Sequence, residues 1–352
     1  MDGLKDGQVK GQMRAVMLQA LHDVALVETA IPSIDDDELL IHMQATTICT
    51  SDLHDIAANP YGSPLPLSLG HEGAGRVAAL GAKVTGFAIG DRVVTHPVHP
   101  CGECRACRTG TAHLCMNLRH FGLNMPGTFA EYYVVRVDRA RHLPDSVSFP
   151  VGALFEPICV CLQAIAQTRV PAGEPLLILG DGPFGLLMAR LAHAQGIAPV
   201  VVAGHQDFRL AQAGTGVITI NTAAIADPTT ALLDVIGGEE YGAIILATDA
   251  KGAIPTALAC LRRKRRLVIF ASLLGETPID LMTVQAKELE IVGACNDEDL
   301  LEDALAYLEE NALSLAELVT HCLPLDAYAE AIELAAQGQD RAIKVALVVE
   351  DL

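Results

Sequence analysis

Four cysteines lie close together in one polar loop and could enclose a single metal ion. Cys101, Cys104, Cys107 and Cys115 have the spacing Cys-x2-Cys-x2-Cys-x7-Cys. Short Cys-x-x-Cys steps let one loop direct several sulfur atoms at the same point, and structural zinc prefers a closed tetrahedron of such ligands. Free thiols or disulfides are the alternative, but cysteines packed this densely more often bind metal. The spacing therefore predicts a structural zinc site.

A second group of metal-capable residues is spread along the first half of the chain. It comprises Cys49, His71, Glu72 and Glu156. A thiolate, an imidazole and carboxylates are the ligands that a catalytic zinc takes when one position stays open for water or substrate. Each residue alone would be unremarkable. Their occurrence together with the cysteine loop and with the nucleotide motif below predicts a catalytic metal site.

A glycine-rich motif in the second half could bind a dinucleotide. Gly180, Gly182, Pro183, Phe184 and Gly185 belong to the segment Gly-Asp-Gly-Pro-Phe-Gly, between an expected strand at 176–179 and an expected helix at 186–194. In that context the glycines permit a tight turn and close approach of a pyrophosphate, which the helix N-terminus attracts. An ordinary glycine turn is the alternative.

The end of the next expected strand bears on the choice of cofactor. Dinucleotide sites of this type usually carry an acid there that binds the ribose 2′-hydroxyl. Here the strand at 200–202 leads into Gly204 and His205, and Arg209 follows. The missing acid and the two basic groups favour NADP over NAD, although Asp207 could still turn toward the ribose and Arg209 could pack on the adenine.

Composition excludes some classes of partner. Lys and Arg total 24 against 43 Asp and Glu, so the formal net charge is -19. Such a chain repels phosphate backbones and anionic lipid surfaces, and we expect neither a nucleic-acid nor a membrane partner. The ten cysteines fit a metal site plus scattered core thiols in a reducing cytoplasm. We expect neither an export signal nor a transmembrane segment.

The pattern of apolar, polar and turn-forming residues along the chain predicts two domains of different fold class. Residues 1–12 are expected to form a flexible tail. Short strand-like runs such as 38–43, 75–80 and 132–137 follow, and from about residue 160 apolar strands alternate with helices, typical of a parallel sheet covered on both faces. The last fifty residues, with helices near 299–310 and 327–336 and a strand at 344–349, are expected to rejoin the first domain. The charged run 262–266 is interpreted as a solvated turn.

The motifs together resemble those of the zinc-dependent medium-chain alcohol dehydrogenases. The segment beginning at Gly70 reads Gly-His-Glu-x2-Gly-x5-Gly-x2-Val and ends at Val84. The resemblance covers the chain from about residue 13 to its end. It implies an α/β protein with a GroES-like, mainly β catalytic domain at 13–160 and 298–352, and a Rossmann doubly wound parallel-sheet domain at 161–297. It also implies an active site in the cleft between the domains, and a homodimer or homotetramer.

The resemblance also implies two zinc ions per chain and roles for individual residues. Cys49, His71 and a glutamate would hold the catalytic zinc. In the polyol branch Glu72 is the ligand and Glu156 holds the metal's water, whereas other relatives use the Glu156 position directly, so both stay open. Ser51 would accept the substrate proton and pass it through the cofactor ribose to His54, whose ordinary pKa near 6.5 suits the task.

The implied activity is hydride transfer between NAD(P) and a secondary alcohol, a polyol or sugar derivative. The alternatives are a threonine-type hydroxy amino acid dehydrogenase and a catalytically silent binding protein derived from the family. The chain departs from the pattern at Thr50, where a glycine is common, and at Asn296, near which sorbitol-type relatives carry an arginine. The departure at Asn296 disfavours sorbitol itself, while Thr50 removes no ligand. Candidate pocket residues are Tyr61, His120, Phe121 and Asn296.

Overall fold

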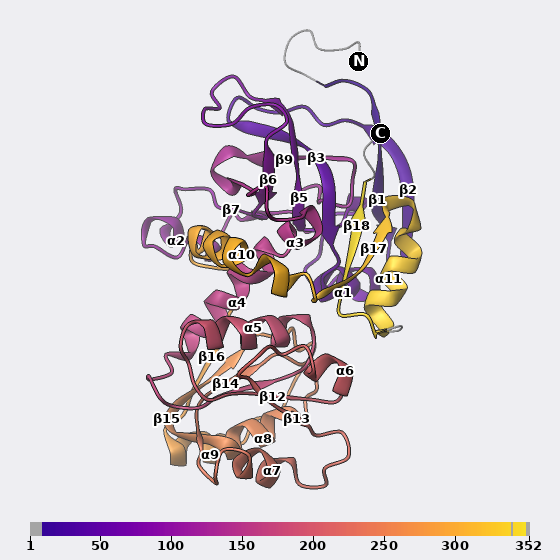
Figure 1. Ribbon diagram of the computed structural model, residues 1–352. Helices are drawn as coiled ribbons and strands as arrows, with labels where there is room; N and C mark the ends of the chain where they lie inside the picture. The colour runs from indigo at the N-terminus through magenta and orange to yellow at the C-terminus, as the bar shows by residue number, and fades with distance from the viewer. Residues whose placement is uncertain (1–8, 339–340, 350–352) are drawn as a thin grey trace. The chain divides into compact units, whose positions relative to one another are not determined.

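The computed structural model describes residues 9–338 and 341–349, and it divides into two compact units (Figure 1). The first unit runs to Pro157 and resumes at Glu298, and the second is Ile158–Asp297. The predicted boundaries were 160/161 and 297/298, so the first boundary lies three residues earlier. Residues 1–8 of the predicted tail lie outside the described residues. The tail prediction is wrong at its end, because Gln12 already opens a strand and pairs with Ala30.

The first unit is mainly β. Its strands are β1 (Gln12–Ala20), β2 (Asp23–Ala30), β3 (Glu38–Thr47), β4 (Leu67–Ser68), β5 (Glu72–Leu80), β6 (Arg92–Thr95), β7 (Val98–His99), β8 (Arg119–His120), β9 (Tyr132–Arg136), β10 (Ala140–His142), β17 (Val319–Pro324) and β18 (Lys344–Val348). They form a sheet in the order β10-β6-β5-β3-β18-β17 with β9 also on β3, a second sheet β2-β1-β4, and the pair β7-β8. β18, from the last part of the chain, pairs with β3, so this part rejoins the first unit as predicted.

Short helices connect these strands. They are α1 (Thr50–Ala58), α2 (Arg105–Arg108), η1 (Ala112–Leu114), η2 (Val137–Arg139), α3 (Phe149–Gly152), α10 (Leu301–Leu315), η3 (Leu325–Ala327) and α11 (Tyr328–Gln337), while α4 (Phe155–Thr168) begins in this unit and continues into the second. Alternate apolar residues of β3, including Leu39, Ile41 and Met43, are buried in one core with Tyr133 and Val135 of β9. This alternation matches the two-residue period of a strand.

The register of β3 brings distant parts of the sequence together. Thr47, its last residue, lies opposite Glu72 of β5 on one side and opposite Ala346 of β18 on the other. Residues near the start of β5 and near the start of β18 therefore meet beside the end of β3. The helix α1 begins three residues later.

The second unit is a doubly wound parallel sheet. Its elements are β11 (Leu176–Leu179), α5 (Pro183–Ala194), β12 (Val200–Gly204), α6 (Asp207–Leu210), β13 (Ile218–Asn221), α7 (Pro228–Asp234), β14 (Tyr241–Leu246), α8 (Ala253–Cys260), β15 (Leu261–Ile269), α9 (Leu281–Lys287) and β16 (Glu290–Gly293). The strand order β13-β12-β11-β14-β15-β16 is all parallel. In order of appearance this is 3-2-1-4-5-6, the arrangement of Rossmann folds. The predicted α/β fold class is confirmed.

The interpretation of 262–266 as a solvated turn is wrong. These residues belong to β15, although its register with β14 passes from Leu261 directly to Arg266, and four of the five cations pair with carboxylates. Arg262 and Arg265 bind Glu174 at 3.1 and 2.7 Å, Arg266 binds Glu290 of β16 at 2.5 Å, and Lys264 binds Glu288 at 3.2 Å. Carboxylates of neighbouring segments therefore compensate most of the charge of this run.

One stretch, Phe149–Thr168, is long and apolar enough to cross a membrane. However, 78% of its apolar window is buried inside the protein. Burial to that extent identifies this stretch, within the described residues, as part of the protein's own core.

Candidate metal centres and nucleotide-binding loop

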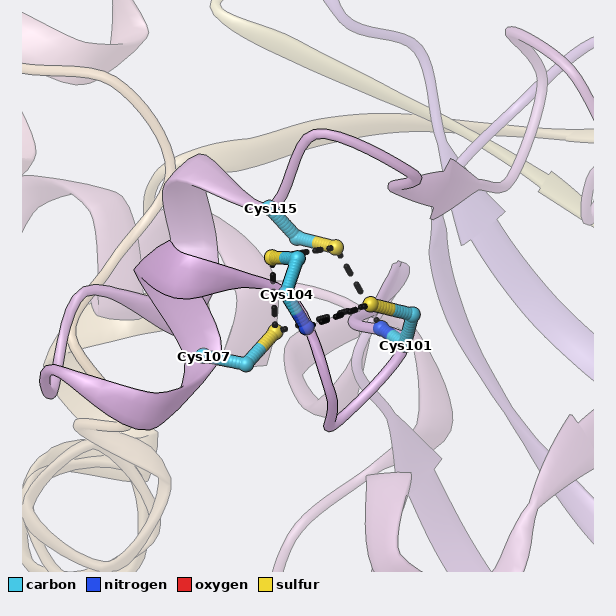
Figure 2. A group of neighbouring side chains, drawn as sticks. All are labelled: Cys101, Cys104, Cys107 and Cys115. Carbon is cyan, nitrogen blue, oxygen red and sulfur yellow. Dashed lines mark hydrogen bonds between the residues drawn. The ribbon is translucent and has the colours of Figure 1, made fainter.

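The four predicted cage cysteines converge on one point (Figure 2). The sulfur of Cys104 lies 3.5 Å from that of Cys107 and 3.7 Å from that of Cys115, and the sulfurs of Cys101 and Cys107 are 3.9 Å apart. A tetrahedron with zinc–sulfur bonds of about 2.3 Å has sulfur–sulfur edges of about 3.8 Å. The cysteine cage, Cys101, Cys104, Cys107 and Cys115, therefore fits one zinc ion.

Backbone N–H groups support the thiolate form in the cage. The amides of Cys101 and Asn117 donate to the sulfur of Cys115, each at 3.3 Å. Hydrogen bonds from the amides of Cys107 and Met116 lower the pKa of Cys104 to about 6. Burial and the neighbouring thiols raise the pKa of Cys107 to about 11. Since zinc binds the thiolate and not the thiol, Cys104 favours metal binding before metal arrives, whereas zinc must displace the proton of Cys107.

The second predicted site gathers Cys49, His71 and Glu72, here called the buried ligand cluster. One ligand atom of each lies within 4.8 Å of the others. Cys49 precedes α1, while His71 and Glu72 stand at the entry to β5. All three side chains are buried. A thiolate, an imidazole and a carboxylate at these separations fit the ligand set of a catalytic zinc.

Gly70 sets the approach of the segment that carries His71. Its φ is +87°, and a Cβ there would lie 2.1 Å from Cδ1 of Phe129. Both the backbone conformation and the contact require glycine. The glycine of the Gly-His-Glu motif therefore acts by letting this segment pass close to the core.

Asp52 ties the two ligand-bearing segments together. Its Oδ2 accepts the amide N–H of Cys49 at 2.8 Å, and its Oδ1 accepts that of Gly70 at 3.1 Å. The same Oδ1 lies 3.5 Å from Nδ1 of His71. Burial lowers the pKa of His71, but the charges of Asp52 and Cys49 outweigh it and raise that pKa well above its ordinary value. Asp52 thus orients the imidazole so that Nε2 is the atom free to bind metal.

Glu72 has strong partners of its own. Lys344 of β18 donates to both of its carboxylate oxygens at 2.7 Å, and the hydroxyl of Thr47 donates to Oε2. Glu72 is 0% and Lys344 2% exposed. Burial alone would lower the pKa of Lys344, yet the charges of Glu72, Cys49 and Glu156 raise it, which favours the ammonium form of this lysine. A buried ion pair therefore lies directly against the buried ligand cluster.

Glu156, the other predicted ligand, lies in the first turn of α4 and is buried. It does not belong to the buried ligand cluster found in the described residues, but its charge acts on Lys344. Lys344 therefore faces two carboxylates that are both candidate ligands. If zinc binds Glu72, Lys344 is left to interact with Glu156. If zinc binds Glu156, Lys344 stays paired with Glu72.

The predicted proton-transfer residues lie on α1. The hydroxyl of Ser51 is 3.5 Å from Nε2 of His71, so it stands at the metal-facing side of the imidazole. His54 lies one turn later, and within the described residues its buried Nδ1 has no hydrogen-bond partner. Beside it in sequence, burial and the negative charge of Asp52 raise the pKa of Asp55 to about 7. Asp55 of this helix can thus hold a proton near neutral pH.

The candidate pocket residues are distributed unevenly. The ring of His120 lies 5.6 Å from that of His71, and burial lowers the pKa of His120 to about 3, so it is neutral. Phe121 is fully buried in the core, whereas Tyr61 is 57% exposed. Asn296 belongs to the second unit. Of the four, only His120 is placed by the structure beside the buried ligand cluster.

The nucleotide motif forms the predicted turn between β11 and α5. Gly182 caps α5, Pro183 is its first residue, and Phe184 and Gly185 follow in the first turn. A Cβ at Gly185 would lie 2.0 Å from the carbonyl oxygen of Gly180, so the turn closes only with glycine there. The amide groups at the start of α5 therefore remain open to an anion, which fits a pyrophosphate.

The end of β12 differs from the expectation. Gly204 and His205 stand where predicted, and the guanidinium of Arg209 lies over the ring of Phe208, 5.6 Å from its centre. However, a carboxylate is present at this end of the strand, supplied by Asp181 of the glycine turn. The amides of His205 and Gln206 donate to its Oδ2 at 2.8 and 2.7 Å.

Sequence reasoning missed three residues that the structure places at the sites: Asp52, Asp181 and Lys344. Lys344 had a visible signal, because it is a lone charge in the apolar run Ala-Ile-Lys-Val-Ala-Leu. A buried charge requires a partner, so that pattern predicts a buried acid elsewhere. Asp52 and Asp181 carry no such signal, since acids near helix starts and in turns are common.

Comparisons with known proteins agree with this architecture. Residues 35–145 match the alcohol dehydrogenase GroES-like domain. Sorbitol dehydrogenase of Bacillus subtilis is 30% identical over 96% of this chain and 97% of its own length. L-threonine 3-dehydrogenase of Deinococcus radiodurans is 31% identical over 93% of this chain and 96% of its own. A protein of Sinorhizobium meliloti described as a zinc-binding dehydrogenase and solved with NADP bound has a TM-score of 0.88 and 26% identity, covering 96% of this chain and 99% of its own.

Proposed function

Because this chain belongs to the zinc-dependent medium-chain alcohol dehydrogenases, in the branch of the polyol and threonine dehydrogenases, and is an NAD(P)-dependent enzyme, we propose that it oxidises a secondary alcohol of a polyol or sugar derivative. The observation that carries this proposal is the buried ligand cluster with Ser51 beside it. Sorbitol and L-threonine, after which two relatives are named, both carry a secondary hydroxyl, and this supports the proposal.

Two bound groups would supply chemistry that side chains lack. Zinc, when bound, makes a hydroxyl proton easier to lose, and the nicotinamide takes up a hydride. Cys49 and His71 would hold the catalytic zinc with Glu72 or Glu156, and the cysteine cage would hold the structural zinc. The turn Gly180, Gly182, Pro183, Phe184 and Gly185 would hold the pyrophosphate, with Gly204, His205 and Arg209 near the ribose.

The chain's own residues perform the remaining tasks. Asp52 keeps His71 in one orientation, because its carboxylate is itself fixed by two backbone amides. The hydroxyl of Ser51 accepts the proton that the substrate loses, and His54 receives it for release to solvent. His120, which lies next to His71 and is neutral, would be an uncharged side chain beside the substrate. Burial of the cluster excludes water that would compete for the open position.

A substrate panel tests this proposal directly. Protein loaded with two zinc ions is assayed against polyols, sugar alcohols, simple secondary alcohols and L-threonine, with NAD⁺ and NADP⁺ in parallel. Cofactor reduction by polyols at higher kcat/KM than by threonine is the expected result. If threonine is preferred, the runner-up activity is correct. If cofactor and zinc bind but no alcohol reduces the cofactor, the chain is a silent binding protein.

We further propose that the protein acts in the cytoplasm as a homodimer or homotetramer without nucleic-acid or membrane partners. The net charge of -19 and the ten free thiols support this proposal. Sedimentation velocity checks the oligomeric state, and a monomer at micromolar concentration would contradict it.

A further inference from the structure

Asp181 links the ends of two neighbouring strands of the second unit. It follows β11 directly, and β11 pairs with β12 in parallel, with Leu179 opposite Ala203. From this position its carboxylate crosses to the residues after β12, where Oδ2 accepts the amides of His205 and Gln206 at 2.8 and 2.7 Å. Within the described residues, no hydrogen bond reaches its Oδ1.

This is the end of the strand at which an NAD site is expected to present an acid. In doubly wound sheets a carboxylate at the end of the second strand binds the ribose 2′-hydroxyl, and the strand order makes β12 that strand. Here the strand ends in glycine, and the acid comes from the turn after the first strand instead. The two residues are complementary, because a Cβ at Gly204 would lie 2.3 Å from Cβ and Cγ of Asp181.

The position of the carboxylate also decides what else can bind. Two consecutive backbone N–H groups are suitable donors for a phosphate oxygen, but Asp181 already occupies both. A 2′-phosphate would therefore lose these donors and lie against a carboxylate, and like charges at short range repel. A ribose hydroxyl meets no such penalty and can donate to the open Oδ1.

We propose that Asp181 is the specificity-determining residue of the cofactor site and that it selects NAD over NADP. This inference rests on the proposed function as an NAD(P)-dependent dehydrogenase and opposes the preference that the missing strand acid suggested. His205 is exposed and Arg209 lies three residues beyond Gln206, so two basic residues belong to the segment that carries these amides. Removing the negative charge of Asp181 therefore turns the site toward a 2′-phosphate.

The test measures binding as well as turnover. Full-length, zinc-loaded protein is titrated with NADH and NADPH by fluorescence, and KM is measured for NAD⁺ and NADP⁺. The parent protein is expected to bind NADH at least tenfold more tightly than NADPH. In Asp181→Asn, which keeps the size of the side chain, NADPH is expected to gain at least tenfold relative to NADH.

Matched variants keep the result interpretable. Asp207→Asn removes the same charge from the start of α6, just beyond the two amides, at a carboxylate held by Asn221 at 2.6 Å, and is expected to leave the NADH/NADPH ratio within twofold. Gly204→Ala, which displaces Asp181 by its Cβ, is expected to shift the ratio in the direction of Asp181→Asn. A parent protein that prefers NADPH, or an equal shift in Asp207→Asn, overturns the inference. If neither nucleotide binds the parent, the proposed function fails instead.

Discussion

The cysteine cage and the buried ligand cluster use similar ligands but are assembled in different ways. The cage takes its four sulfurs from one loop of fifteen residues, Cys101 to Cys115, whose backbone amides point at them. The buried ligand cluster draws on two segments and is completed by Lys344, which lies 272 residues from Glu72 in the sequence. Local spacing is enough to build the first site, whereas the second depends on the register of β3 with β5 and β18.

The largest expected difference between the two sites is in catalysis. Cys49→Ala is expected to lower kcat/KM more than a thousandfold, since it removes a ligand of the metal that would bind the substrate, while the melting temperature changes little. Cys104→Ser is expected to lower the free energy of unfolding by about 3–5 kcal/mol, because loss of a structural metal is among the costliest changes. Activity assays, zinc analysis and thermal unfolding check both, with the exposed Cys322→Ser as control. Equal effects on stability would remove the distinction between the two sites.

The next effect concerns the ion pair beside the buried ligand cluster. Lys344→Met is expected to cost about 3–5 kcal/mol of unfolding free energy, since it leaves the carboxylate of Glu72 buried without its cation. Chemical denaturation measures this cost, and the double variant Lys344→Met with Glu72→Gln is expected to recover much of it.

The variant Lys344→Met also tests whether Glu72 or Glu156 is the zinc ligand. If Glu72 ligates zinc, the metal replaces the lysine as the neutralising charge, and Lys344→Met destabilises the zinc-loaded protein less than protein lacking the catalytic zinc. If Glu156 is the ligand instead, Glu72 still lacks a cation when zinc is bound, and the two costs are equal. X-ray absorption at the zinc edge checks the number of oxygen ligands independently.

A smaller effect is expected at Asp52. Asp52→Asn keeps the hydrogen-bond acceptor on one side but removes the charge that supports His71, so zinc affinity at the buried ligand cluster is expected to fall about 10–100-fold. Competition with a chromophoric chelator measures this change. Zinc retention by the cage in the same protein is the internal control, and an unchanged affinity at the buried ligand cluster would show that Asp52 is not needed to orient His71.

The smallest effect is the pH dependence of metal uptake. Burial lowers the pKa of His71, but the charges of Asp52 and Cys49 raise it above its ordinary value, so in metal-free protein the imidazole holds its proton to higher pH than a free histidine and zinc must displace it. Affinity is therefore expected to rise with pH, about tenfold per unit for this proton, and to level off once pH passes the raised pKa. In Asp52→Asn the pKa of His71 falls, so the plateau begins at lower pH. Calorimetry in buffers of different ionisation enthalpy counts the protons released.

The same contrast explains how much of the molecule could be predicted from sequence. The fold class, the strands at 176–179 and 200–202 and the candidate ligands Cys49, His71 and Glu72 follow from periodicity and short motifs, which are local properties. Lys344, Asp52 and Asp181 could not be assigned, because their partners are set by strand register and by the crossing of turns. The charged run 262–266 failed for the same reason, since its carboxylate partners lie in other segments.

The place of Lys344 at the start of β18 has a consequence for biosynthesis. Translation delivers Cys49, His71 and Glu72 first, and the cation that neutralises Glu72 follows 272 residues after this carboxylate. Until then, a nascent chain presents an uncompensated carboxylate to any metal it meets. The ion pair forms only after β18 has been synthesised and has paired with β3.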